Sequence, residues 1–251
     1  MDIGVKPGTR SKRDPQNHRT IDRITQILEE VVYHPGIGFA ELVRAMDVAK
    51  SSVHGFISGL LAAGWLHQQD GGFYLGPTAY GLTLANGHLK AGTVSIEELK
   101  ALNEEVRAAV FLGVPAGDHL IYIAEVGQDP VIGYEAKSDI RRVLLRTAGG
   151  KALLAAQSAD DRNRFLRRRP ADEKELIEKF LAEIDQIRRT GIAVNFRPNV
   201  NRFAIAAVIR NETGKPLASV TLVGTEEAIR PRVDKLSKTL LKYIQRWSAK
   251  S

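Results

Sequence analysis

The first third of the chain carries three runs of apolar residues at helical spacing. The apolar positions are Ile21, Ile24, Ile27, Leu28, Val31 and Val32 in the first run, Phe39, Leu42, Val43 and Met46 in the second, and Val53, Ile57, Leu60 and Leu61 in the third. A period of about 3.6 residues predicts three helices, each with one apolar face. Thr20 is the expected N-cap of the first helix, and Ser51 and Ser52 are expected to cap the third.

A short β-hairpin is predicted directly after the third helix. Its first strand is predicted to start at residues 64–67, its turn is Asp70-Gly71-Gly72, and its second strand covers residues 73–75. Helix, turn, helix and hairpin in this order indicate a winged helix-turn-helix, whose third helix enters the major groove of DNA. The alternatives are that these helices form only an ordinary core or that the winged helix binds protein.

The predicted DNA contacts lie on the polar side of the third helix, in the hairpin and just before the first helix. They are Lys50, Ser51, Ser52, His54, Ser58, Gln68, Gln69 and Arg19. Residues 1–19 are rich in basic and polar side chains and predict a disordered basic arm, which is either a simple tail or a contact to phosphates or the minor groove.

Residues 77–84 predict one more short helix, and Gly and Asn residues over 85–93 suit a linker. Ser95 and Glu98 have the spacing of a capping box and predict a helix that continues to Val106. The expected organisation is therefore an arm over residues 1–19, a winged helix-turn-helix over 20–85, a linker and linker helix over 86–106, and a second domain over 107–251.

The second domain mixes strands and helices. Strands are predicted over 107–114, 119–126, 131–135, 141–146, 192–196, 203–210 and 217–223, with a hairpin turn at 115–118. Helices are predicted from the Gly149-Gly150 pair onward, over 160–166 and 172–189, and over 226–247. Strand pairs at both ends of the domain favour an antiparallel sheet with helices packed on it. The fold class is thus mixed α+β.

Composition excludes several classes of protein. The chain has 251 residues, a formal net charge of +7 and no cysteine, so it has no disulfides and no thiolate chemistry. It has no long apolar run and no secretory signal, which predicts a cytoplasmic protein without a membrane partner. Residues 1–90 hold 9 Lys or Arg and 8 Asp or Glu, against 27 and 21 in the rest, so the predicted DNA-binding half is not the basic half.

No catalytic or metal site emerges from the motifs. Thr147-Ala148-Gly149-Gly150-Lys151 lacks the first Gly and the final Ser or Thr of a P-loop, because Leu145 and Ala152 hold those positions. The 6 histidines show no metal-binding spacing, and no nucleophile elbow is present. We predict no enzyme, no metal and no cofactor, with a small-molecule enzyme carrying an accessory winged helix as the alternative.

Two features are ambiguous between structure and binding. The Gly149-Gly150 pair opens a helix whose free N–H groups suit a small carboxylate, or it simply allows close packing. The arginine run over residues 162–169 is interpreted as a solvated face, with anion or partner binding as the alternative.

Together these pieces resemble the IclR family of transcriptional regulators. The resemblance is carried by the winged helix, by Phe73-Tyr74-Leu75-Gly76, by residues 145–155 (LRTAGGKALLA), and by Gly191-Ile192-Ala193 followed by residues 203–208. It implies a GAF-like second domain that senses a small organic or aromatic acid. It also implies a homodimer, or a dimer of dimers, on double-stranded operator DNA. The effector residues implied by the resemblance are Ala148, Gly149, Gly150, Asn195, Ala204, Thr221 and Val223.

The chain departs from the family pattern at both sites. Relatives usually carry Arg after the histidine of the recognition helix, where this chain has Gly55. Asn195 stands where relatives have an acidic or polar residue, and Arg197 and Arg202 make its surroundings basic. These basic residues favour an anionic effector.

Overall fold

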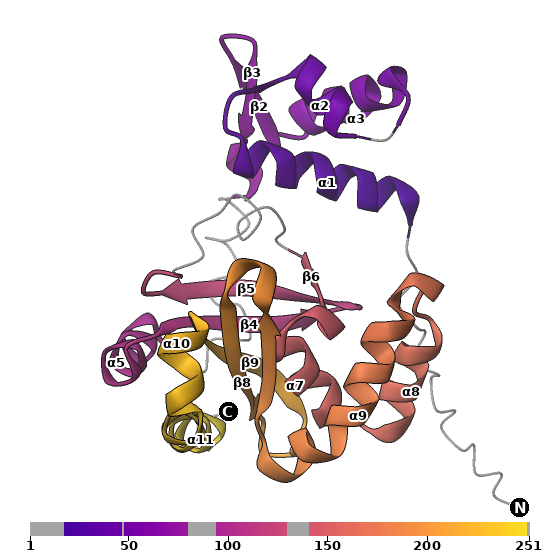
Figure 1. The fold of residues 1–251 in the computed structure, drawn as a ribbon. Coiled ribbons are helices and arrows are strands. Elements are labelled where there is room, and N and C mark those ends of the chain that lie inside the picture. Colours follow the sequence, from indigo (N-terminus) through magenta and orange to yellow (C-terminus); the bar gives the residue numbers. More distant parts are fainter. Residues whose placement is uncertain (1–17, 47, 80–93, 130–140, 250–251) are drawn as a thin grey trace, which may run out of the picture.

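The computed structural model describes residues 18–46, 48–79, 94–129 and 141–249 (Figure 1). Its N-terminal part contains three helices and a small antiparallel sheet of order β1-β3-β2. The elements are α1 (Arg19–Tyr33), β1 (Ile37–Gly38), α2 (Phe39–Ala45), α3 (Lys50–Ala62), β2 (Leu66–Gln69) and β3 (Gly72–Leu75). The apolar faces of the three helices meet Leu66 and Phe73 in one core, so the predicted winged helix-turn-helix is confirmed.

Three details of this region differ from the prediction. The first helix begins at Arg19, so Arg19 is helical rather than part of an arm, and the N-cap is His18 instead of Thr20. Ala49 is the N-cap of α3 and makes no side-chain cap bond, which leaves Ser51 and Ser52 inside the first turn. The two-residue strand β1 was not predicted, because it is too short to show a period.

The hairpin turn has the geometry that its sequence requires. Asp70 and Gly71 both have positive φ, 51° and 80°, which is the conformation of a two-residue type I′ turn. Leu66 pairs with Leu75 and Gln69 with Gly72 across the hairpin. Residues 77–79 are helical, while most of the predicted short helix and linker lies outside the described residues.

The second part of the chain begins with α5 (Ile96–Val106), which carries the predicted capping box. The Ser95 side chain accepts a hydrogen bond from the Glu98 amide at 3.2 Å, and the Glu98 carboxylate accepts one from the Ser95 amide at 3.1 Å. The helix ends at Arg107, which adopts a left-handed conformation with φ 51° and turns the chain into the sheet.

A six-stranded antiparallel sheet of order β6-β5-β4-β9-β8-β7 forms the centre of this part. Its strands are β4 (Ala109–Ala116), β5 (His119–Val126), β6 (Arg141–Val143), β7 (Ala193–Arg197), β8 (Arg202–Arg210) and β9 (Pro216–Gly224). The helices are α7 (Ala148–Ala156), α8 (Ala159–Arg167), α9 (Lys174–Thr190), α10 (Glu226–Ile229) and α11 (Val233–Ser248). Short 3₁₀ turns are η1 (Leu144–Arg146), η2 (Ala171–Glu173), η3 (Pro198–Val200) and η4 (Arg230–Arg232).

The helices cover both faces of the sheet (Figure 1). Helices α5 and α11 pack on one face, where Trp247 and Leu240 are buried against alternate residues of β8 and β9. Helices α7 and α9 pack on the other face together with Phe165 of α8. Alternation along each strand therefore sends one set of side chains to α11 and the other set to α7.

Local corrections to the predicted strands follow from turn chemistry. The β4–β5 turn is only Gly117-Asp118, since Pro115 and Ala116 remain in β4. Residues 144–146, predicted as strand, form η1 instead. The predicted last helix is interrupted by η4, which contains Pro231, and the predicted strand 131–135 lies outside the described residues.

In the described ranges, no helix has the length and apolarity needed to cross a bilayer. The same ranges contain no group of three His, Asp or Glu side chains placed to hold a metal ion.

Candidate functional site

Helix α3 presents a narrow exposed stripe, here called the α3 stripe. It consists of Ser51, His54, Gly55, Ser58 and Gly59, all exposed. The opposite side of the helix is anchored by the buried side chains of Val53, Ile57 and Leu60. A Cβ atom added at Gly55 or at Gly59 would meet no atom within 4 Å. Among the described residues, nothing lies against the two glycines, and the stripe is slim, as a helix entering a major groove must be.

Two predicted DNA contacts lie at the edge of this stripe against α2. The Lys50 ammonium lies 5.8 Å from the centroid of the Phe39 ring, and the His54 ring meets Phe39 edge-on at 6.0 Å. Phe39 thus fixes the position of both side chains while they stay exposed. Ser52 is half-buried and is the least available of the predicted contacts on α3.

The hairpin contributes two exposed glutamines. Gln68 and Gln69 are consecutive on β2, so their side chains leave opposite faces of the hairpin. The Gln68 amide donates a hydrogen bond to the Gly71 carbonyl at 3.4 Å, next to the turn. Arg19 is exposed on α1 and belongs to neither α3 nor the hairpin.

The start of α7 is packed unusually closely on the sheet. A Cβ atom at Gly149 would lie 2.6 Å from Ser219 Oγ and 2.9 Å from Thr221 Oγ1 of β9. A Cβ atom at Gly150 would lie 2.2 Å from the Leu144 carbonyl oxygen. Only glycine allows this approach at either position. The packing interpretation of the glycine pair is therefore confirmed.

The hydrogen bonding at this helix start separates Gly150 from its neighbours. The Gly150 amide donates to Thr147 Oγ1, the N-cap side chain, at 3.0 Å. This amide is already in use, so Gly150 is not a free donor. Within the described residues, no hydrogen bond engages the amides of Ala148 and Gly149.

Two buried hydroxyl groups lie beneath the first turn of α7. Ser219 and Thr221 are 0% and 1% exposed, and neither hydroxyl has a hydrogen-bond partner. An unsatisfied buried hydroxyl costs about 1–3 kcal/mol. Both side chains point at Gly149.

The other predicted effector residues gather on the same sheet face. Asn195 pairs with Ala204, and Ala204 pairs with Val223, across β7, β8 and β9. Ala148, Ala204 and Val223 belong to one buried cluster under α7. Six of the seven predicted effector residues therefore lie together at this face. The seventh, Gly150, faces η1 instead.

A polar cluster beside this face was missed by the sequence prediction. Arg202 Nε lies 2.8 Å from Asp129 Oδ2, and its guanidinium lies over the Phe111 ring. Burial raises the pKa of the neighbouring Tyr122 hydroxyl, and the positive charge of Arg202 offsets only part of the rise. Since Arg202 is paired with Asp129, its charge is not free for an anion, whereas Arg197 forms no ion pair with any residue that the structure describes. A pair 73 residues apart gives no signal in the sequence.

One cavity, here called the basic cavity, lies between η1, α9 and β7 and has a volume of about 670 Å³. Its cationic lining residues are Arg142, Arg146, Lys151, Lys179 and Arg197. Asn195 and Thr147 also line it. The buried Lys151 ammonium contacts Glu183 at 2.6 Å, and burial lowers the pKa of Lys151 while Glu183 opposes the shift.

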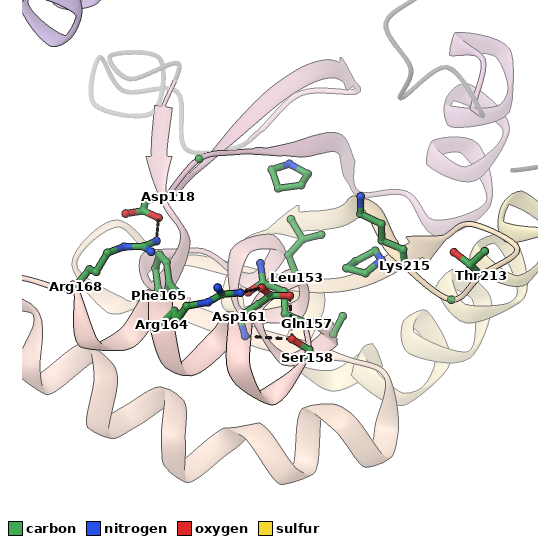
Figure 2. Close-up of a pocket in the computed structure, with 15 residues that line it drawn as sticks. Asp118, Leu153, Gln157, Ser158, Asp161, Arg164, Phe165, Arg168, Thr213 and Lys215 are labelled. Atoms are coloured by element: carbon green, nitrogen blue, oxygen red, sulfur yellow. Dashed lines mark hydrogen bonds and ion pairs between the residues drawn. The ribbon is translucent and has the colours of Figure 1, made fainter. Parts of the chain in front are cut away.

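A second cavity of about 600 Å³, here called the paired-charge cavity, lies between the β4–β5 turn, α8 and the β8–β9 turn (Figure 2). Asp118 accepts from Arg168 at 2.8 Å and also from Arg169. Asp161 pairs with Arg164 and accepts from Ser158 Oγ. Asn195 lines the basic cavity, and the other predicted effector residues line neither cavity.

The arginine run is therefore only partly a solvated face. Arg162 is 8% exposed and donates to the Gln157 carbonyl. Arg169 is 11% exposed and binds Asp118. These two contacts tie α8 to its surroundings, so the solvated-face interpretation is wrong for Arg162 and Arg169.

Comparison with known proteins decides between a regulator and an enzyme. The family described as "Bacterial transcriptional regulator IclR C-terminal" matches residues 88–250, and the "IclR helix-turn-helix domain" matches residues 20–70. The chain belongs to the IclR family. IclR proteins regulate transcription, and the enzyme alternative is thereby set aside.

Individual IclR relatives have low sequence identity to this chain, but the matches cover most of both chains. The HTH-type transcriptional regulator BhcR of Paracoccus denitrificans is 26% identical over 87% of this chain and 82% of its own length. The IclR structure from Thermotoga maritima has a TM-score of 0.65 at 19% identity, covering 92% of this chain and 98% of that one. An IclR homolog from Microbacterium hydrocarbonoxydans, solved with 4-hydroxybenzoate, has a TM-score of 0.68 at 17% identity, with coverage of 92% and 98%.

Proposed function

We propose that this IclR regulator binds operator DNA through the α3 stripe and the hairpin, and that a small organic acid bound under α7 changes its affinity for the operator. The α3 stripe carries the first half of the proposal. It is exposed and slim, Lys50 lies next to it at the start of α3, and the hairpin with the exposed Gln68 and Gln69 follows α3 in the chain. Phosphate contacts position such a helix, while contacts to base edges select the sequence.

The unpaired hydroxyls of Ser219 and Thr221 support the second half. They lie under a helix start whose first amides form no hydrogen bond among the described residues. The positive end of a helix dipole and free amides stabilise a carboxylate. The structural neighbour solved with 4-hydroxybenzoate, an aromatic acid, supports the choice of an organic acid as the effector class.

Regulation then follows from differential affinity. We propose a homodimer, or a dimer of dimers, in which two winged helices meet two half-sites of the operator. An effector that binds one arrangement of the winged helices more tightly shifts the population toward it.

The DNA half is tested by a gel-shift assay with the intergenic DNA upstream of the gene, at several salt concentrations. Lys50→Ala should weaken binding to every sequence and lower the salt slope by about 1, since one phosphate contact is lost. Lys174→Ala, an exposed lysine of α9, is the matched control and should change nothing. An unchanged slope in Lys50→Ala would exclude this residue as a phosphate contact.

The effector half is tested by Thr221→Val, which removes the hydroxyl and keeps the shape. The variant should be as stable as the parent or slightly more stable, because an unsatisfied group is gone. It should nonetheless lose most of the thermal stabilisation that carboxylic acids give to the parent. Equal stabilisation of both proteins would show that the hydroxyl does not bind the effector.

A further inference from the structure

Among the described residues, the lining of the basic cavity holds more cationic than acidic side chains. Its five cationic residues face only two carboxylates, those of Asp172 and Glu175. Lys151 is matched by Glu183, which is outside the lining. Among the described residues, the side chains of Arg146, Lys179 and Arg197 form no ion pair with any carboxylate.

The paired-charge cavity, in the same domain, serves as a comparison because most of its charged lining residues form ion pairs. There, Asp118 and Asp161 each engage an arginine of the lining (Figure 2). These ion pairs leave Lys215 as the lining cation without a carboxylate partner in the part of the chain that the structure describes. The two cavities are similar in volume, so the difference between them is one of charge and not of space.

The basic cavity also adjoins the proposed effector site. It includes Thr147, the N-cap of α7, and Asn195, which neighbours Ala204 in the sheet. The Asn195 side chain donates to the Arg146 carbonyl at 3.1 Å and so holds the arginine backbone at the cavity. Because Asn195 is neutral, it does not offset the nearby cations.

The charge and the position together specify the ligand. We propose that the effector carries two acid groups, one held at the start of α7 and the second held in the basic cavity by Arg146, Lys179 and Arg197. This inference rests on the proposed effector site under α7. A monocarboxylate would satisfy one positive region and leave the other unpaired, whereas a dicarboxylate or a phosphorylated acid satisfies both. A volume of about 670 Å³ lies within the range of small-molecule sites.

Matched acids test the proposal on the full-length protein. Calorimetric titration would compare terephthalate with 4-methylbenzoate, glutarate with pentanoate, and 3-phosphoglycerate with glycerate. Each pair keeps the carbon skeleton similar and changes the number of acid groups. We expect at least one diacid to bind about tenfold or more tightly than its partner, with a steeper loss of affinity as salt is raised.

Charge-removing variants locate the second acid group. Arg146 and Lys179 are exposed, so Arg146→Gln and Lys179→Gln should fold normally. Each should weaken the diacid about tenfold and leave its monoacid partner unchanged. Arg188→Gln, an exposed arginine of α9 that lines neither cavity, is the control and should weaken neither ligand.

The outcomes separate the inference from the proposed function. If monoacids bind as well as diacids, or if Arg146→Gln and Lys179→Gln weaken both ligands equally, the two-acid effector is wrong while the site under α7 stands. If no acid of either series binds, the effector half of the proposed function fails as well. Selective loss of diacid binding in both variants establishes the proposal.

Discussion

Helices α3 and α7 each contain two glycines, and the glycines serve opposite purposes. In α3, Gly55 and Gly59 face open space, and a Cβ atom there would touch nothing within 4 Å. In α7, Gly149 and Gly150 are buried, and a Cβ atom would meet Ser219 in one case and the Leu144 backbone in the other. We infer from this difference that glycine keeps the exposed side of α3 slim for the proposed contact with DNA. In α7, glycine instead allows the helix to pack closely on β9 and η1.

Of the glycine substitutions in α3 and α7, Gly150→Ala should destabilise the protein most. The added methyl would overlap the Leu144 carbonyl and Cα, which are backbone atoms and cannot rotate away. We expect a loss of about 3 kcal/mol of unfolding free energy, at the upper end for overpacked sites. Urea denaturation followed by circular dichroism measures it. A loss below about 1 kcal/mol would show that η1 moves freely.

Gly149→Ala should have a smaller effect, because the atoms it meets are the side-chain hydroxyls of Ser219 and Thr221. We expect a loss of about 1–2 kcal/mol. Ser219→Ala removes the nearest oxygen and an unsatisfied hydroxyl, so it should be neutral alone and should restore part of the loss in the double variant. Additive effects in the same denaturation experiment would mean that the two residues do not clash.

Gly59→Ala should stabilise the protein, in contrast to both α7 substitutions. Alanine is favoured over glycine inside a helix by about 1 kcal/mol, and nothing near Gly59 opposes the added methyl. The melting temperature should therefore rise. A fall would show that Gly59 packs against something beyond the described residues.

Gly55→Arg tests whether α3 contacts DNA, and it should affect folding stability least of these substitutions. The resemblance to the IclR family implies Arg at this position, and the open surroundings among the described residues accept it. The salt slope of DNA binding should increase by about 1 if the new guanidinium reaches a phosphate, or one base preference should sharpen if it reaches a guanine. Gly55→Gln is the uncharged control. Binding identical to the parent in slope and preference would place the stripe away from the DNA.

Local chemistry made part of the molecule predictable from the sequence. The capping box of Ser95 and Glu98 and the turn at Asp70 and Gly71 are set by residues only a few positions apart. The capping box formed as predicted, and the predicted turn is shorter by one residue because Gly72 belongs to β3. The helical periods of α1 to α3 placed most core residues correctly, but Ile21 and Val32 of the predicted apolar face are exposed. The strand β1 and the turn η1 were missed because pairing with β3 and packing under α7 decide them.

The candidate site depended on contacts between distant residues. The sequence located the α3 stripe, since exposure follows from helical period. It did not reveal the Arg202–Asp129 pair or the clamp of Arg168 and Arg169 on Asp118, whose members lie 50 to 73 residues apart. The basic cavity likewise combines η1, α9 and β7, and its excess of charge appears only when these segments meet.

The open surroundings of the α3 stripe also bear on how such a regulator acquires new targets. In the part of the chain that the structure describes, neither of its glycines contacts another segment, so we expect side chains to be exchangeable there at little cost in folding. If the α3 stripe reads DNA as proposed, substitutions there would change which promoters the protein recognises and leave the second domain unchanged. The α7 glycines have no such freedom, and changes in ligand preference are expected to arise around them, in residues such as Asn195 and Arg197.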